Sequence, residues 1–164
     1  GNHEEAISKR HGFNIHRHIC DSLACENLGY SFLFLLKLTS PEHRRTRSVT
    51  VYGVQGFGGG SRTEGGPITK YARLISHYDA DIYVTAHDHD FFLKKVARVG
   101  VNNNGKVQSR DIMLCNTGSF SKTLSDGSTP SWAETRGFPP RLLGGIVLDL
   151  KPEKNGWIEI NATQ

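Results

Sequence analysis

The apolar positions of this chain fall into short runs that polar, glycine-containing segments separate. Residues 31–38 are almost continuously apolar and residues 81–86 form a shorter apolar run, and both have the length of a buried strand. Residues 49–54 alternate with the period of two that is typical of a strand. At 15–27 and 63–78 apolar side chains recur every three or four residues, which predicts two amphipathic helices.

The C-terminal half has the pattern of paired strands. Residues 91–101 and 106–115 flank Asn102–Gly105, whose Asn-Gly pair suits a tight hairpin turn. A long polar connection follows, and residues 142–150 and 157–160 predict two last strands. Because strands separated by helices come before consecutive strands, we expect an α/β sandwich rather than an all-α or all-β domain.

Several residues mark the helices near the N-terminus. Residues 4–10 favour a short polar helix, Asn14 can cap the helix that follows, and Gly29 suits the end of that helix. Cys20 and Cys25 lie within it, and we interpret both as buried packing residues rather than as metal ligands.

The composition is that of one ordinary globular domain. The chain has 164 residues, of which 37% are hydrophobic and 22% charged, and its formal charge is +4. This mild positive balance suits a polyanionic substrate but does not demonstrate one. No apolar run reaches the roughly 18 residues of a membrane span. The three cysteines lack CxxC spacing, which favours reduced thiols in a cytoplasmic protein.

The first candidate for chemistry is His87-Asp88-His89, directly after the predicted strand 81–86. Two imidazoles one residue apart lie on the same side of an extended chain, and in a loop they can splay toward two metal ions. Imidazole suits Mn, Fe, Zn or Ni. By itself the motif is equally compatible with a polar loop that carries two exposed histidines.

The N-terminal residues and a glycine-rich segment add further candidates. An amide oxygen such as that of Asn2 can complete a divalent-metal shell, and His3 can donate a proton to a leaving oxygen. Residues 55–60, Gln-Gly-Phe-Gly-Gly-Gly, would let the backbone approach a phosphate or a metal closely. Arg62 and Lys70 follow this loop and could meet a substrate phosphate. Each segment alone is also compatible with an ordinary terminus or a flexible turn.

The order of these motifs resembles that of the calcineurin-like metallophosphoesterases, in particular their phage and bacterial branch. Gly-Asn-His-Glu at 1–4 is followed by a strand with a glycine-rich loop, a helix, and a strand ending in Ala86-His87-Asp88-His89. The resemblance extends to the Gly-Ser-Phe turn at 118–120 and to Trp132-Ala133-Glu134. It therefore covers most of the chain, but only the later motifs of the family.

This resemblance implies a role for each matching residue. Asn2 and His87 would bind the second of two divalent metal ions, and His89 would bind the first. His3 would be the catalytic general acid, or would stabilise the scissile phosphate. Gln55 stands where the family has the histidine of the glycine-rich loop, and we expect it as a weaker metal ligand. A hydroxide activated by the two metals would attack phosphorus.

The chain also departs from the family pattern. The early Asp-x-His and Gly-Asp-x-x-Asp motifs are absent, and Ala86 replaces a glycine. We therefore expect residues 1–164 to be the C-terminal part of a single metallophosphoesterase domain, with a partial four-layer α/β/β/α sandwich. By itself the chain should bind metal poorly and hydrolyse substrate poorly. We also expect it to expose a sheet edge and apolar surface, and therefore to self-associate.

The sequence predicts a metal-dependent phosphoester hydrolase in a bacterial or phage-infected cell. A phosphodiester is the expected substrate, with nucleic acid as one candidate and no membrane partner. The alternative is a degenerate, non-catalytic nucleic-acid-binding module that keeps the fold, which Gln55 and Ala86 motivate. The basic run at 43–47 is interpreted as a solvated turn rather than as a nucleic-acid contact.

Overall fold

The computed structural model describes residues 2–40, 46–59, 63, 65–101, 104–125, 127, 129–152 and 158–164. Its helices are α1 (Asn2–His11), α2 (Ile15–Ser22), α3 (Gly66–Ala72) and α4 (Trp132–Thr135), with the 3-10 turn η1 (Arg73–Ser76) continuing α3. Its strands are β1 (Ser31–Thr39), β2 (Thr46–Val54), β3 (Ile82–Thr85), β4 (Phe91–Val101), β5 (Val107–Thr117), β6 (Val147–Pro152) and β7 (Ile158–Thr163).

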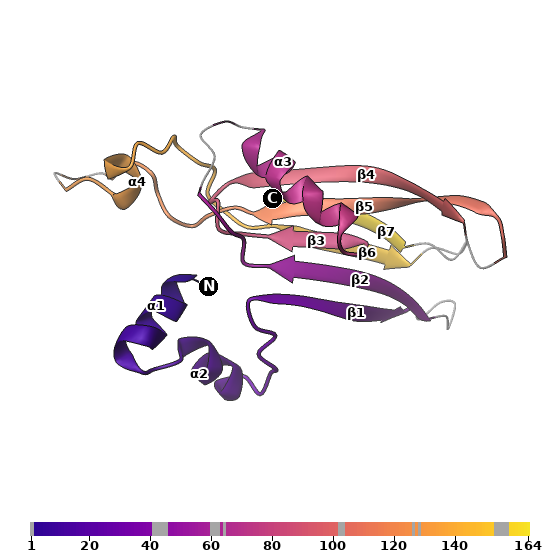
Figure 1. Ribbon diagram of the computed structural model, residues 1–164, viewed down its shortest axis with the longest axis horizontal. Coiled ribbons are helices and arrows are strands. Elements are labelled where there is room, and N and C mark those ends of the chain that lie inside the picture. Colours follow the sequence, from indigo (N-terminus) through magenta and orange to yellow (C-terminus); the bar gives the residue numbers. More distant parts are fainter. Residues whose placement is uncertain are drawn as a thin grey trace.

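Five strands form the main sheet, in the order β1-β2-β3-β5-β4 (Figure 1). The three central strands β2, β3 and β5 are parallel, and the outer strands β1 and β4 run antiparallel to their neighbours. The carboxyl ends of the central strands therefore meet at one edge of the sheet, the edge beside which α1 and α2 lie (Figure 1). Ligand sites of open α/β sheets form at this kind of edge.

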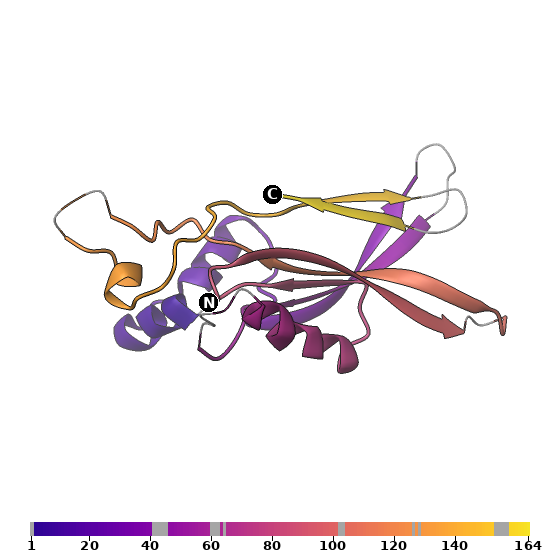
Figure 2. The same ribbon diagram turned by 90° about the horizontal axis from the view of Figure 1, so that it is seen from above.

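The main sheet has a different cover on each face (Figure 2). On one face α3 and η1 pack through a core that includes Tyr71, Leu74 and Tyr83. On the other face the antiparallel pair β6-β7 packs through Ile160, which joins the core around Ile82. The predicted α/β class is thus confirmed, and the described layers are helix, sheet and sheet. A four-layer sandwich is not confirmed.

The predicted helices exist, but they are shorter than their apolar pattern. Helix α2 begins after Asn14, whose Oδ1 accepts a hydrogen bond from Arg17 N at 2.9 Å, as predicted. It ends at Ser22 rather than near residue 27, because Leu23 is 70% exposed and Ala24 turns the chain with φ 50°. With no buried residue in α2, packing does not extend the helix.

Two further expectations about this region are corrected. Helix α3 begins only at Gly66, because a Gly pair precedes Pro67 and a proline in the first turn fixes the start of a helix. Cys25 is exposed and Cys20 only half-buried, so Cys25 is not the packing residue that we expected.

The predicted hairpin is confirmed, since β4 and β5 pair along their whole length. No helix in the described ranges is long and apolar enough to cross a membrane.

Candidate functional site

The candidate site lies where the three parallel strands end. Gln55 follows β2, Ala86 and the His87-Asp88-His89 motif follow β3, and Ser119 comes two residues after the end of β5. Parallel pairing of β2 with β3 and of β3 with β5 brings these segments together, although they are about 30 residues apart in sequence. The topology therefore places the predicted metal-ligand motif beside the glycine-rich loop.

The two histidines of the motif do not continue the extended strand. His87 and His89 both have a positive φ, 74° and 54°, so their side chains diverge. Nε2 of His87 lies 2.8 Å from the Gly58 carbonyl oxygen, and Nδ1 of His89 lies 3.1 Å from Oγ of Ser119. Ala86 is not among the residues with positive φ, so a methyl group at this position is compatible with the turn.

Among the residues that the structure describes, the hydrogen bonds of His87 and His89 each engage one ring nitrogen and leave the other available. When one nitrogen of a histidine is engaged by a carbonyl or hydroxyl group, the ring is oriented and the other nitrogen can serve as a ligand. In His87 the second nitrogen is Nδ1, and in His89 it is Nε2. Each ring is thus held in a defined orientation by a neighbouring loop.

His3 is close enough to this motif to affect its charge. The pKa of His89 is lowered, first because the ring is partly withdrawn from water, and then because His3 and His87 would repel a proton on it. Asp88 opposes these effects. Three imidazoles from two distant segments of the chain therefore share one electrostatic neighbourhood at the carboxyl edge of the sheet.

Asp88, between the two histidines, points into the protein. Its side chain is 1% exposed and lies 2.5 Å from Nζ of Lys70, which also donates to the Phe57 carbonyl oxygen at 2.9 Å. This buried ion pair joins α3, the glycine-rich loop and the histidine motif.

A glycine permits this close packing. Gly56 has φ 111°, and a side chain there would lie 2.5 Å from Cβ of His87 and 2.8 Å from the Ala86 carbonyl oxygen. That carbonyl oxygen accepts a hydrogen bond from the Tyr71 hydroxyl at 3.0 Å, and the Tyr30 hydroxyl donates to the Gly56 carbonyl oxygen. Burial, and then the nearby Asp88 carboxylate, raise the pKa of Tyr71. The hydroxyl therefore remains a donor.

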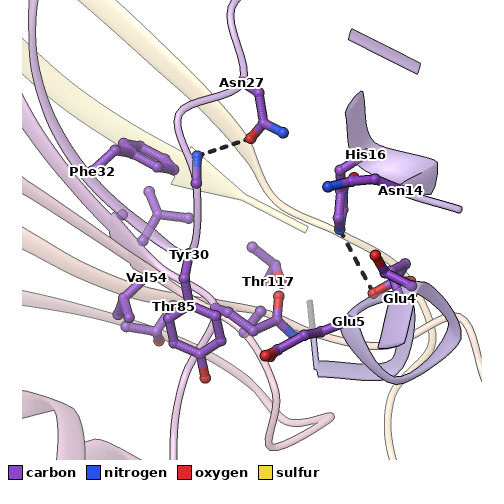
Figure 3. Close-up of a pocket in the computed structure, with 16 residues that line it drawn as sticks. Glu4, Glu5, Asn14, His16, Asn27, Tyr30, Phe32, Val54, Thr85 and Thr117 are labelled. Carbon is purple, nitrogen blue, oxygen red and sulfur yellow. Dashed lines mark hydrogen bonds and ion pairs between the residues drawn. The ribbon is translucent and has the colours of Figure 1, made fainter. Parts of the chain in front are cut away.

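A cavity of about 400 Å³ lies between α1, α2 and the carboxyl edge (Figure 3). Gln55, half-buried, forms part of its wall together with Ala86. The remaining wall residues come from both helices, from the segments that flank α2, and from the ends of four strands: Glu4, Glu5, Ser8, Asn14, His16, Asn27, Gly29, Tyr30, Phe32, Gly53, Val54, Val84, Thr85 and Thr117.

Not all predicted site residues can be placed. Arg62 and most of the basic run at 43–47 lie outside the described residues, and of Asn2 only the backbone, at the start of α1, is described. Lys70 is described and is held by Asp88. Within the described part of the chain, no three His, Cys, Asp or Glu side chains converge on a position that could hold a metal ion.

Sequence reasoning missed two groups that shape this region. Tyr30 precedes a predicted strand, and only the tertiary structure shows that its hydroxyl contacts the glycine-rich loop. Ser119 lies in the Gly-Ser-Phe turn at 118–120, and the sequence does not show that its hydroxyl contacts His89. Its position shortly after a strand that is parallel to β3 is the signal that could have identified it.

No family model, no curated protein and no solved structure matches this chain significantly.

Proposed function

We propose that this protein is a metal-dependent phosphoester hydrolase of the calcineurin-like type, with a phosphodiester as its substrate. The observation that supports the proposal is the position of His87 and His89 directly after β3, at the carboxyl edge of the parallel strands, where the charge of His3 also lowers the pKa of His89.

The metal ions would be held by His87, His89, Gln55 and Asn2. Imidazole and amide oxygen together suit Mn, Fe, Zn or Ni, and two oriented rings are fewer ligands than a pair of ions requires. We therefore infer that these residues supply part of the shell. Bound divalent ions would supply Lewis acidity and neutralise the charge of the phosphate.

The residues of the chain itself would position the ester and move a proton. His3 is exposed at the start of α1 and can approach a leaving oxygen as a general acid. Gly58 and Ser119 would keep the two ligand imidazoles oriented through their hydrogen bonds. Arg62 and Lys70 remain predicted contacts of the substrate phosphate. For Lys70 this contact would require sharing its ammonium group with Asp88.

Metal binding is the direct test. Titration of the chain with Mn²⁺, followed by electron paramagnetic resonance, should show saturable binding that His87→Ala and His89→Ala each weaken about tenfold or more. His77→Ala is the matched control, because this exposed histidine caps η1 away from the motif. Hydrolysis of bis-p-nitrophenyl phosphate with Mn²⁺ should be slow, and should be lost in the same two variants.

Two outcomes would contradict the proposal. If His87→Ala and His89→Ala bind Mn²⁺ as the unaltered chain does, the metal site is elsewhere. If the chain has no Mn²⁺ affinity but binds DNA with a strong salt dependence, the non-catalytic nucleic-acid-binding module is favoured instead.

A further inference from the structure

The cavity beside the histidine motif is a candidate pocket for the organic part of a substrate. Its wall shares Ala86 with the turn that carries His87, and Thr117 with the end of β5. A group held in the cavity would thus lie next to the proposed phosphate position. The volume of about 400 Å³ is within the range of small-ligand pockets and suits a nucleobase with its sugar.

Two carboxylate side chains lie in the wall of the cavity. Glu4 and Glu5 project from α1 into its wall, across from Tyr30 (Figure 3). A hydrogen bond from its own backbone N–H lowers the pKa of Glu4, and the Lys9 ammonium, 2.6 Å away, lowers that of Glu5. Both carboxylates are therefore ionised at neutral pH. Oε2 of Glu4 also lies 3.7 Å from Nε2 of His16, which lines the same cavity. The carboxylate oxygens can accept hydrogen bonds from N–H groups.

Two aromatic rings supply the opposite wall. The hydroxyl of Tyr30 donates to the Gly56 carbonyl oxygen, which fixes the position of the Tyr30 ring. The Phe32 ring lies over Gly53, where a β-carbon would collide with the ring. Aromatic side chains that are fixed in this way offer flat surfaces on which a planar heterocycle can stack.

We propose that this cavity binds a nucleobase that carries an exocyclic amino group, as adenine and cytosine do. The carboxylates at one side would accept the N–H groups of the base, while Tyr30 and Phe32 would stack on it. The substrate would then be a nucleotide phosphodiester. This last step rests on the proposed function, whereas binding of the base itself does not.

Free nucleosides test the proposal, because they carry no phosphate and need no metal. Cytidine and uridine form the sharpest pair, since they differ by an amino group in place of a carbonyl oxygen. Nuclear magnetic resonance titration should show saturable binding of cytidine and at least fivefold weaker binding of uridine. Tyr30→Leu should weaken the binding of cytidine about tenfold, because stacking is lost. Glu5→Gln should reduce the difference in affinity between cytidine and uridine.

Leu35→Ala is the matched control. Leu35 is on the same strand as Phe32 but on the opposite face, 53% exposed and outside the cavity wall, so binding should not change. Thermal unfolding of each variant checks that it is folded, and Phe32→Leu provides a second wall variant if Tyr30→Leu does not fold. Equal binding of cytidine and uridine, or no saturation by either, overturns the proposal.

The two proposals fail in different experiments. Cytidine binding without Mn²⁺-dependent hydrolysis would sustain the pocket and reject the hydrolase. Hydrolysis that is lost in His87→Ala, together with absent cytidine binding, would sustain the hydrolase and reject the pocket.

Discussion

Nζ of Lys70 lies 2.7 Å from Oδ1 of Asp88 and 2.5 Å from Oδ2, in an ion pair whose carboxylate is 1% exposed. The same ammonium lies 4.6 Å above the Tyr71 ring. The pair connects helix α3 with the loop that carries both candidate ligand histidines. A carboxylate buried in this way is stable only while its cation stays in place.

Replacing the cation should therefore destabilise the fold. Lys70→Met would leave the Asp88 carboxylate buried without its partner, and we expect the free energy of unfolding to fall by about 3 kcal/mol. The double variant Lys70→Met/Asp88→Asn should recover part of this loss, because the uncompensated charge is removed. Urea unfolding measures both values. Neutral surface changes typically alter the free energy of unfolding by less than about 0.5 kcal/mol. An effect of Lys70→Met within this range would contradict the structural role of the pair.

The glycine-rich loop offers a graded test of backbone geometry. Gly56→Ala should cost at least about 1–3 kcal/mol, because its φ is 111° and the added methyl group would meet Cβ of His87 at 2.5 Å. Gly59→Ala has open space and no positive φ, and should be nearly neutral. Chemical denaturation of the two variants provides the comparison. Equal stability would show that Gly56 is not held against His87.

The sequence predicted those parts of the fold that depend on interactions between residues close together in the chain. The β4-β5 hairpin was predictable because two alternating runs flank an Asn-Gly pair. The start of α2 was predictable because Asn14 can accept a hydrogen bond from the first turn. The end of α2 was not, because the residues after Ser22 have an apolar helical pattern but are exposed in the structure.

The candidate site, too, was predictable only in part. The position of His87 and His89 after a strand was visible in the sequence, and the strand order supplied their neighbours. The direction of each ring was not visible, because a positive φ at two non-glycine residues reverses the expected alternation. Nor could the sequence show that Lys70 pairs with Asp88, a contact between elements 18 residues apart.

The three cysteines should differ in reactivity toward a disulfide reagent such as dithionitrobenzoate. Cys25 is exposed and should react first. The pKa of Cys20 is raised, by partial burial and by the neighbouring Cys25 thiol, so it should react more slowly. Burial raises the pKa of Cys115 to about 12, and this thiol should react only after unfolding. Cys25→Ser should abolish the fastest phase, and rapid reaction of Cys115 in the native protein would contradict its burial.

The capping box of α4 should make one loop sensitive to acid. Glu134 accepts hydrogen bonds from Ser131 N at 2.6 Å and Ser125 N at 3.1 Å, and these lower its pKa below the ordinary value of 4.5. A lowered carboxyl pKa stabilises the fold above the unfolded-state value, and this contribution is lost as the pH falls through the folded-state value.

Amide exchange measures this dependence directly. Protection of the Ser125 and Ser131 amides should be present above about pH 4.5, the reference pKa, and should fall as Glu134 is protonated. Glu134→Gln should show low protection at every pH, whereas Glu159→Gln, on β7, should leave the profile unchanged. A pH-independent profile in the unaltered chain would mean that the carboxylate does not hold the loop.

The outer edge of β1 should promote self-association. Among the described strands β1 pairs only with β2, and Leu33 and Leu35 on its helix-facing side are 55% and 53% exposed. An open, apolar edge strand is a template for pairing with another chain. Light scattering should therefore show an apparent mass that rises with protein concentration.

Leu33→Lys/Leu35→Lys should shift the protein toward the monomer, because charge on an edge strand opposes pairing. Leu124→Lys places the same charge on a 61% exposed loop residue and should have little effect. A concentration-independent monomer in the unaltered chain would show that this edge does not associate.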